Sequence, residues 1–295
     1  MNKRIRDIND ALRIAVEQID SSHMPPTTEF ITSGLAVSTG ITELDTTLGG
    51  IQNSDLLLIA GRPENGKTSL SITLLLHIAL QEKKRVAFFS LEDSLELLTL
   101  KMISSYAHIP LQSMQQGTLR DEQWNTLHNA VRELHNASIY FFDSAKQTII
   151  AICSDIQHVI GKHDIDIVFI DYLQLIRSTS KRRTIDDELP SILRALKELA
   201  FINNIPIVVL AQLPRSVEER INKRPMLSDV RAMCRADDLI DVALLLYRPE
   251  LYEANVEEKG IVEIEIAKQR NGPTGVVKQK LFASTTNSLE RKNYE

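Results

Sequence analysis

Short apolar runs alternate with longer segments of helical spacing through most of the chain. The short runs are rich in β-branched and aromatic residues, which predicts buried strands, and the segments between them repeat apolar positions every three or four residues. Such alternation is typical of a parallel sheet with helices on both faces. The runs that we expect to form strands are 56–60, 86–90, 139–142, 165–170 and 205–211.

The C-terminal part has a different pattern. Between residues 242 and 282 the sequence consists of strand-like runs separated by turn residues, namely VALLLY, IVEIEIAK and GVVKQKLF. Neighbouring strands joined by turns favour antiparallel pairing. We therefore predict an α/β fold in which a mostly parallel central sheet, flanked by helices, carries an antiparallel C-terminal extension.

A separate amphipathic segment begins the chain. Its apolar positions recur in steps of three and four, which predicts one stripe along a helix of about four turns. Residues 21–40 show no apolar period and include a Pro-Pro pair, as expected of a linker. The stripe can dock on a neighbouring copy of the chain or pack on its own domain, and the pattern leaves both open. We thus expect an interface helix in 1–22, a flexible linker in 23–36 and one large domain in 37–295. The stripe consists of Ile5, Ile8, Leu12, Val16 and Ile19.

Composition narrows the class of protein. At 295 residues with 43% apolar content, the chain fits one large domain and a short appendage. Its two cysteines cannot form a disulfide framework, and its seven histidines show no Cys/His grouping with metal-ligand spacing. The start is charged and no apolar stretch approaches the roughly 20 residues that span a bilayer, so we expect a cytoplasmic protein without a membrane anchor. A net charge of −5 restricts any nucleic-acid site to a local basic strip.

The strongest motif fits G-x-x-x-x-G-K-[ST] and lies between the predicted strand 56–60 and a helical segment. Its glycines let the backbone curl so that N–H groups converge on phosphate oxygens, and the following helix adds partial positive charge. We expect Lys67 to bridge the β- and γ-phosphates and the Thr68 hydroxyl to bind Mg²⁺. The motif therefore predicts a site for ATP with Mg²⁺. The predicted nucleotide-binding residues are Gly61, Arg62, Pro63, Glu64, Asn65, Gly66, Lys67, Thr68 and Ser69.

Two carboxylate positions follow predicted strands. Asp171 closes a buried apolar run and is expected to join Thr68 at the Mg²⁺ ion, although an aspartate at a strand end also serves as a helix cap. Glu92 follows another such run and is placed to activate the attacking water as a general base. From spacing alone Glu92 competes with Asp93, and a capping role for either stays open.

Several motifs follow one another in an order and spacing that can be matched to a known pattern. They are TGITELDTTLGG, AGRPENGKTSL, FFSLEDS, VFIDYLQLI, LAQLPRSVEERINKRPMLSDVR and IAKQRNGPTG. Together they resemble the C-terminal motor domain of the DnaB-type replicative helicases. The resemblance extends from about residue 37 to residue 283.

The resemblance implies a RecA-like fold and a hexameric ring that couples ATP hydrolysis at subunit interfaces to DNA unwinding, with single-stranded DNA in the central channel. It gives Glu92 the water-activating role ahead of Asp93, and it makes Gln212 the sensor of the γ-phosphate. Lys268 and Arg270 match a pair that reaches into the neighbouring subunit's site. Without the resemblance, two basic residues on one strand face would be interpreted as a solvated edge. A primase or a helicase loader is a candidate partner.

Basic residues gather after the predicted strand 205–211. Loops at this end of the strands face the site, so we expect residues 214–235 to grip DNA phosphates without reading sequence. A second candidate combines Arg177 with the basic run 181–183, and for both segments a solvated loop is the alternative. Neither segment contains an aromatic residue, so we expect contacts to the DNA backbone rather than base stacking. The predicted DNA-binding residues are Arg215, Arg220, Lys223, Arg224 and Arg231.

One stretch departs from the family pattern. The family has a Glu-Ser-Gly type run and then a Glu-Gln-Asp-Ala-Asp segment, whereas residues 232–241 here place Cys234 at the glycine and keep Asp241. A glycine there lets the backbone approach a phosphate. The departure keeps open an ATP-dependent helicase loader, regulator or paralogue that binds DNA without unwinding. A strand-exchange recombinase and a non-catalytic ring component are further alternatives, which the KQRNGPTG run and the intact P-loop and carboxylates respectively argue against.

Overall fold

The computed structural model describes most residues between 36 and 281, and the end of the predicted large domain, 282–295, lies outside the described residues. The helix expected in 1–22 and the linker up to residue 35 lie outside the residues that the structure describes, and so does the basic run 181–183. The described residues are 36–143, 147–178, 185–253, 255–256, 259–270 and 272–281.

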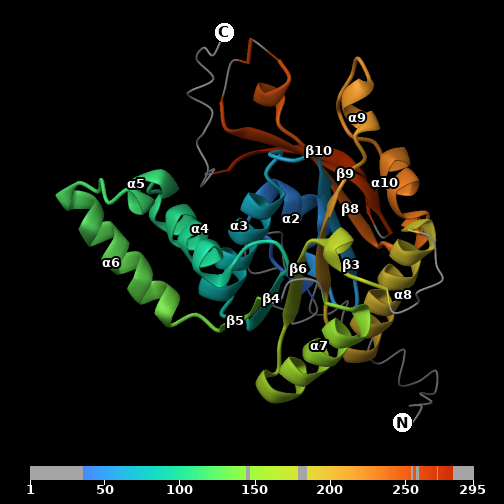
Figure 1. Ribbon diagram of the computed structural model, residues 1–295, viewed down its shortest axis with the longest axis horizontal. Coiled ribbons are helices and arrows are strands. Elements are labelled where there is room, and N and C mark those ends of the chain that lie inside the picture. Colours follow the sequence, from blue (N-terminus) through green and yellow to red (C-terminus); the bar gives the residue numbers. More distant parts are fainter. Residues whose placement is uncertain are drawn as a thin grey trace.

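Eight strands of the described chain form one sheet, in the order β10-β9-β8-β3-β7-β6-β4-β5 (Figure 1). Neighbours from β8 to β5 run parallel to one another, and the last two strands are antiparallel. The predicted α/β fold is therefore confirmed. The strands are β3 (Leu56–Gly61), β4 (Val86–Ser90), β5 (Ile139–Asp143), β6 (Ile167–Asp171), β7 (Ile207–Gln212), β8 (Val242–Tyr247), β9 (Ile261–Gln269) and β10 (Gly275–Lys280).

The strand β8 differs from the antiparallel pairing expected of it. It pairs in parallel with β3, and its antiparallel neighbour is β9. All residues of β8 are buried, whereas those of β9 alternate between buried and partly exposed along most of the strand. The uninterrupted run VALLLY is typical of a parallel strand covered on both faces, and the alternating run IVEIEIAK is typical of an antiparallel one. The parallel part of the sheet thus extends one strand further than predicted.

Helices cover both faces of the sheet (Figure 1). Leu57 and Ile59 of β3 belong to an apolar cluster with α2, α3 and α4, while Leu56 and Leu58 belong to a cluster with α7, α8 and α10. Alternate residues of one strand therefore pack against opposite helical layers. The helices are α2 (Thr42–Leu48), α3 (Lys67–Leu80), α4 (Leu95–Ala107), α5 (Leu111–Gln115), α6 (Asp121–His135), α7 (Ile149–His163), α8 (Ile185–Asn203), α9 (Ser216–Glu219) and α10 (Leu227–Cys234).

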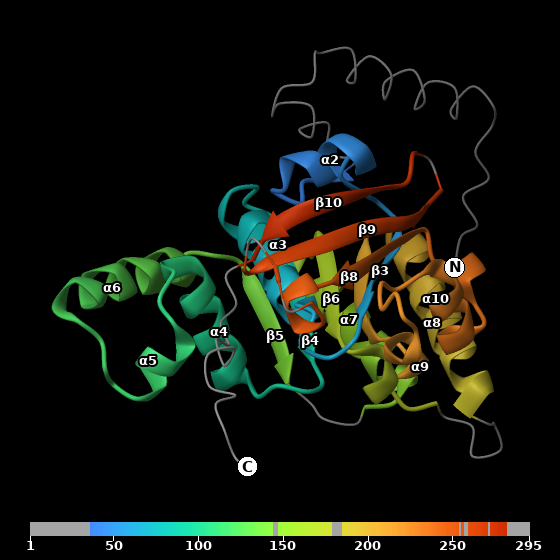
Figure 2. The same cartoon turned by 90° about the horizontal axis from the view of Figure 1, so that it is seen from above.

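Shorter elements complete the fold. The α5–α6 pair projects from the body and is attached beside α4 (Figure 2). Among the described residues, no helix is both long and apolar enough to cross a membrane. The short elements are the antiparallel pair β1 (Ala36–Val37) and β2 (Ile51–Gln52) and the 3₁₀ turns η2 (Leu173–Leu175), η3 (Asp237–Leu239) and η4 (Pro249–Leu251).

The parallel strands end together at one edge of the sheet. In the strand register Gly61 is level with Gln212, and Ser90 is level with Asp171. Loops that leave this carboxyl edge therefore converge in space, and binding sites of open parallel sheets form at such an edge. The opposite edge carries the beginnings of these strands and the end of β9.

Candidate active site

The loop between β3 and α3 has the backbone shape that a phosphate cradle requires. Glu64 and Gly66 both adopt positive φ angles, 65° and 93°, which curl the chain before α3 begins at Lys67. A side chain at Gly66 would be strained in this left-handed conformation. No acidic side chain occupies the described first turn of α3, and Gly66 provides no side-chain cap. The N–H groups at the helix start are thus directed at the loop, ready for an anion.

Lys67 lies inside this loop. Its ammonium donates a hydrogen bond to the carbonyl oxygen of Arg62 at 3.0 Å. Burial lowers the pKa of Lys67, and the negative charges of Asp171 and Glu92 oppose that shift. The ammonium also lines a cavity of about 240 Å³ at the carboxyl edge of the sheet. A nucleotide phosphate in this cavity would bind the ammonium more strongly than the carbonyl oxygen does, because both groups are charged.

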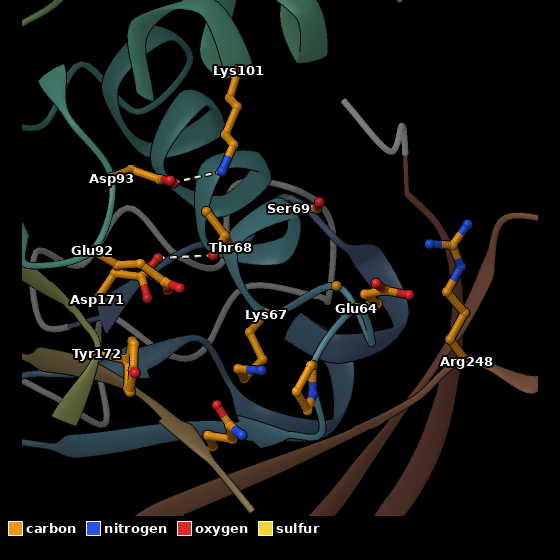
Figure 3. Close-up of a pocket in the computed structure, with 13 residues that line it drawn as sticks. Glu64, Lys67, Thr68, Ser69, Glu92, Asp93, Lys101, Asp171, Tyr172 and Arg248 are labelled. Atoms are coloured by element: carbon orange, nitrogen blue, oxygen red, sulfur yellow. Dashed lines mark hydrogen bonds and ion pairs between the residues drawn. The ribbon is translucent and has the colours of Figure 1, made fainter. Parts of the chain in front are cut away.

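Thr68 and Asp171 come together as the sequence predicts. The Thr68 hydroxyl lies 2.8 Å from Oδ2 of Asp171, and Asp171 is 4% exposed (Figure 3). Burial raises the pKa of Asp171 to about 6, with the charges of Glu92 and Asp93 adding to the rise and the bond from Thr68 opposing it. A cation beside this carboxylate would favour its charged form.

This pair fits Mg²⁺. The ion prefers oxygen ligands, and it is usually held by one or two protein groups together with substrate phosphates and water. Among the described residues, no group of three His, Cys, Asp or Glu side chains is placed to hold a metal ion. A hydroxyl and a carboxylate next to a phosphate cradle are therefore oxygen donors that suit a metal arriving with a nucleotide.

The structure distinguishes the two adjacent carboxylates that follow β4. Asp93 lies 2.5 Å from the ammonium of Lys101 on α4, and its backbone carbonyl accepts a bond from Ser90. Glu92 is exposed and lines the same cavity as Lys67 and Asp171. Within the described residues, no ion pair or side-chain hydrogen bond holds the Glu92 carboxylate (Figure 3). The geometry favours Glu92 as the group that faces a water in the cavity.

Gln212 lies at the end of β7, between this cavity and a neighbouring groove. Its backbone is held by Gln174, whose side chain donates to the Gln212 carbonyl at 2.7 Å and accepts from the Gln212 N–H at 3.2 Å. The same side chain donates to the sulfur of Met233 on α10. Gln174 therefore connects the predicted sensor strand to the region that carries the predicted DNA-binding residues.

The side chain of Arg62, in the loop between β3 and α3, lines the neighbouring groove and not the cavity that contains Lys67. Its guanidinium donates to the carbonyl of Leu213 at 2.8 Å and pairs with Glu218 of α9 at 3.0 Å, and it is 11% exposed. The hydrogen bond from Arg62 holds the pKa of Glu218 below its usual range, although burial opposes the shift. The P-loop is thus tied to the segment that follows β7.

Asn65 fixes the other side of the loop. Its side chain is buried, donates to the Tyr252 hydroxyl at 2.9 Å and accepts from the Arg248 backbone N–H at 2.8 Å. Tyr252 is 187 residues away in the sequence, so no local pattern announces it. Sequence reasoning also missed three residues that line the cavity, namely Lys101 and Arg248, which belong to no quoted motif, and Tyr172, which lies within VFIDYLQLI but received no role.

Lys268 and Arg270 do not line this cavity. In the register of β8 and β9, Val242 pairs with Gln269, and Val242 also pairs with Leu57 near the beginning of β3. The P-loop starts at the other end of β3, roughly 16 Å away at the usual rise per strand residue. Arg270 is therefore placed at the amino edge of the sheet, opposite the phosphate cradle.

The comparison with known proteins agrees with these features. Residues 36–290 match the model of the DnaB-like helicase C terminal domain. This chain belongs to that family. Its membership confirms the resemblance predicted from the motifs and implies nucleotide binding.

Relatives support the assignment along most of the chain. The chain is 38% identical over 260 residues to replicative DNA helicase DnaB of Geobacillus stearothermophilus. The aligned region covers 87% of this chain and 57% of the relative. The chain is 36% identical over 242 residues to replicative DNA helicase DnaC of Bacillus subtilis (strain 168), covering 82% and 53% respectively. The chain thus spans about half the length of the curated relatives it matches.

Solved structures confirm the RecA-like ATPase fold. The ATPase domain of G40P superposes with a TM-score of 0.85 and 32% identity, covering 93% of this chain and 95% of that domain. A DnaB-like replicative helicase, described together with its interactions with primase, superposes with a TM-score of 0.82 and 32% identity, covering 94% and 66%.

Two of the predicted DNA-binding arginines of this DnaB-like domain are held by carboxylates. Arg220 forms a two-pronged pair with Asp229, both distances being 2.9 Å. Arg224 pairs with Glu263 at 2.9 Å and 3.2 Å, and it lies 4.3 Å from the centre of the Tyr247 ring. These contacts stabilise the loop between α9 and α10 and neutralise two of the positive charges within residues 214–235.

Of the other three predicted DNA-binding residues, Arg215 and Arg231 are exposed and Lys223 is partly buried. Arg231 is exposed, with 67% of its side chain accessible, and it pairs with Asp237 at 3.0 Å. Arg215 is exposed at the start of α9, and Lys223 lies 5.7 Å from the centre of the Tyr252 ring. An aromatic ring absent from the local sequence is thus brought to the basic segment by the fold.

The departure at residues 232–241 has a structural explanation at Cys234. Its thiol is buried and lies 3.2 Å from the Val230 carbonyl, so the side chain packs as part of the core at the end of α10. The left-handed conformation of this stretch belongs to the next residue, Arg235, with a φ of 49°. Cys234 therefore does not have to adopt a conformation reserved for glycine.

Proposed function

We propose that this domain is the ATP-driven motor of a replicative DNA helicase, working as a hexameric ring that translocates on single-stranded DNA and unwinds the duplex. The observation that carries the proposal is the division of one catalytic set between opposite edges of the sheet. The phosphate cradle, Thr68, Asp171 and Glu92 gather at the carboxyl edge, whereas Arg270 lies at the amino edge. A ring in which one subunit's amino edge meets the next subunit's cavity reunites them.

The carboxyl edge supplies the groups for phosphoryl transfer. Lys67 and the N–H groups at the start of α3 bind the β- and γ-phosphates, and Thr68 and Asp171 hold Mg²⁺. When bound, the metal neutralises charge on the transferred phosphate. Glu92 accepts the proton of the attacking water, because it faces the cavity while Asp93 is paired with Lys101.

The link to DNA runs through the segment after β7. Gln212 borders both the cavity and the adjacent groove, and Arg62 connects the P-loop to Leu213 and Glu218. Loss of the γ-phosphate is thereby transmitted to residues 214–235, which grip the DNA backbone. A primase and a helicase loader are the partners that such a motor requires, and one solved relative is described with a primase.

A mixing experiment tests the division between subunits. Arg270→Ala should bind nucleotide yet lose hydrolysis by a factor on the order of 10³, since an arginine finger acts on charge that develops in the transition state. Glu92→Gln should be inactive as well. In rings assembled from both variants, some interfaces combine an intact Arg270 with an intact Glu92, and those interfaces should hydrolyse ATP.

Two outcomes would count against the proposal. Co-assembly without hydrolysis above either parent would place Arg270 outside the neighbouring site. Robust ATP hydrolysis by the wild-type ring without strand separation on forked DNA would favour a loader, regulator or paralogue that binds DNA without unwinding it.

A further inference from the structure

Asp241 anchors Arg270 from inside the protein. Asp241 precedes β8 and is 2% exposed. Its Oδ2 accepts from the Leu56 backbone N–H at 2.7 Å and from Lys197 at 2.5 Å. Its other oxygen, Oδ1, pairs with Nε of Arg270 at 2.9 Å. One buried carboxylate thus divides its two oxygens between the core and the predicted finger.

Arg270 is held along one side and exposed at its end. A second bond runs from its Nη2 to the carbonyl of Asp238 at 3.0 Å, and its backbone N–H donates to the carbonyl of Asp241 at 3.2 Å. The side chain nevertheless remains 51% accessible. A guanidinium carries five N–H donors, so these anchors leave donors for another anion.

Lys268 shares the same support. Its ammonium donates to the carbonyl of Asp237, next to the carbonyl that Arg270 uses. Both cations are therefore bonded to backbone carbonyls of the turn η3, which ends two residues before Asp241. Residues 232–241, where the sequence departs from the family pattern, form the base on which this pair is mounted.

We infer that Asp241 is a positioning residue, which orients the Arg270 guanidinium toward the nucleotide of the neighbouring subunit. The inference rests on the proposed trans action of Arg270. A long, freely rotating side chain loses rotamer entropy when it contacts the transition state, and this loss raises the barrier. Small displacements of a catalytic group also lower the reaction rate. The Oδ1 contact removes much of that freedom beforehand. Burial of Asp241 and its bond from the Leu56 backbone N–H keep the anchor itself fixed.

The test asks which pairs of variants restore ATP hydrolysis when they are mixed in rings of the full chain. Asp241→Asn keeps the size of the side chain and removes the charge that holds Nε of Arg270. It should bind nucleotide normally and hydrolyse ATP roughly ten- to a hundredfold more slowly, as for a misplaced catalytic group. Mixed with Glu92→Gln it should recover hydrolysis, because each variant supplies what the other lacks. Mixed with Arg270→Ala it should not, because both then lack a working finger.

Lys197→Gln is the matched control. Lys197 contacts the same carboxylate but not Arg270. Its loss should lower the melting temperature while leaving hydrolysis within about twofold of the wild type, as for a change outside the reacting groups. If Asp241→Asn fails to fold or assemble, Asp241→Glu keeps the charge but displaces it by one methylene. That variant should then fall in the same group as Arg270→Ala.

The opposite pattern of recovery in mixed rings would overturn the inference. An Asp241 variant that recovers activity with Arg270→Ala but not with Glu92→Gln acts on its own subunit's site. Wild-type hydrolysis by Asp241→Asn, or faster hydrolysis because Arg270 is released, would also contradict a positioning role. If Arg270→Ala and Glu92→Gln do not complement each other, the proposed trans action fails, and the inference fails with it.

Discussion

Asp93 lies 2.5 Å from the ammonium of Lys101, whereas the adjacent carboxylate of Glu92 is exposed at the nucleotide cavity. Two neighbouring acids therefore have different surroundings. Asp93 is paired with the ammonium of Lys101, which fixes it to α4. Glu92 is available to take a proton from water, which is the property a general base needs.

Glutamine at position 92 should separate binding from chemistry. Glu92→Gln is expected to bind ATP with near wild-type affinity and to hydrolyse it at least ~100-fold more slowly, as for a lost general base. Asp93→Asn is the control, and it should retain most hydrolysis while weakening the attachment of α4. Steady-state hydrolysis and binding of a fluorescent nucleotide measure both properties. Near-normal turnover by Glu92→Gln would transfer the role to Asp93.

The carboxyl group of Asp55, outside the nucleotide cavity, makes the stability of the domain depend on pH. Burial, with the charge of Asp241 adding to it, raises the pKa of Asp55 to about 6 from an ordinary value of 3.8. The folded protein therefore binds this proton more tightly than the unfolded chain. The contribution to stability is full below the unfolded pKa and is lost as pH rises to about 6.

Asp55→Asn removes this cost of ionisation. After a discount for the partial exposure of Asp55, the variant should be more stable than the wild type by about 1–2 kcal/mol at neutral pH. The difference should vanish near the pKa of the unfolded aspartate. Urea unfolding at neutral pH and at mildly acidic pH measures it. A variant that is less stable than the wild type at neutral pH would show that the charged carboxylate is the favoured form.

At the scale of elements, the segment from the end of β7 to α10 contains arginines of two kinds. Arg220 and Arg224 are bound to Asp229 and Glu263, and they hold the connection between α9 and α10 in place. Arg215 is exposed at the start of α9. A charge count along the sequence treats these arginines alike, although Arg220 and Arg224 are already paired with carboxylates of the same chain.

Substitutions in this segment should divide accordingly. Arg215→Ala and Lys223→Ala are expected to weaken single-strand binding about equally for all sequences, and each lost phosphate contact should reduce the salt slope by about 1. Their melting temperatures should stay near the wild-type value. Arg231→Ala should behave similarly, with a smaller effect because Asp237 already pairs with it.

The internal arginines serve as the comparison. Arg220→Ala leaves the mostly buried Asp229 without its cationic partner, with the Met226 N–H still bonded to it, and should destabilise the domain by about 1–3 kcal/mol. Arg224→Ala should also lower stability, since it leaves Glu263 unpaired and uncovers the Tyr247 ring. Calorimetry and single-strand titrations in parallel distinguish the two kinds. Loss of DNA affinity at unchanged stability in Arg220→Ala would place that residue on the DNA instead.

At the scale of the whole molecule, the nucleotide cavity and Arg270 lie at opposite edges of one sheet. The distance follows from the strand register: β9 returns antiparallel to β8, and its end is level with the beginning of β3. In the proposed ring, a subunit of this shape binds a nucleotide by itself and presents Arg270 to the next subunit. The proposal therefore makes hydrolysis depend on the assembly.

Dilution should expose this dependence. Hydrolysis per subunit is expected to fall as the protein is diluted through the range in which the ring dissociates, because each complete site needs two subunits. Nucleotide affinity per subunit should change far less, since the phosphate cradle lies within one chain. Light scattering at each concentration gives the oligomeric state. A constant hydrolysis rate per subunit in fully dissociated protein would show that one chain suffices.

The amino-acid sequence by itself determined the elements and the chemistry of the phosphate site. Gly61 to Thr68 are contiguous, and the apolar runs on either side predict the strand and the helix that shape the loop between them. Asp171 follows from the same logic, because parallel strands end at a common edge. These features depend on local backbone preferences and periodicity, which a single segment contains in full.

Tertiary structure decided which side chains work together. It placed β8 parallel to β3, paired Asp93 with Lys101, assigned Arg224 to Glu263 and seated Arg270 on Asp241. The partners in the last three pairs are 8, 39 and 29 residues apart, and Asn65 reaches Tyr252 across 187. Such pairs form because the strand order and the helix packing bring particular positions to one point. Neither the charge nor the periodicity of a segment specifies the partner that it will meet there.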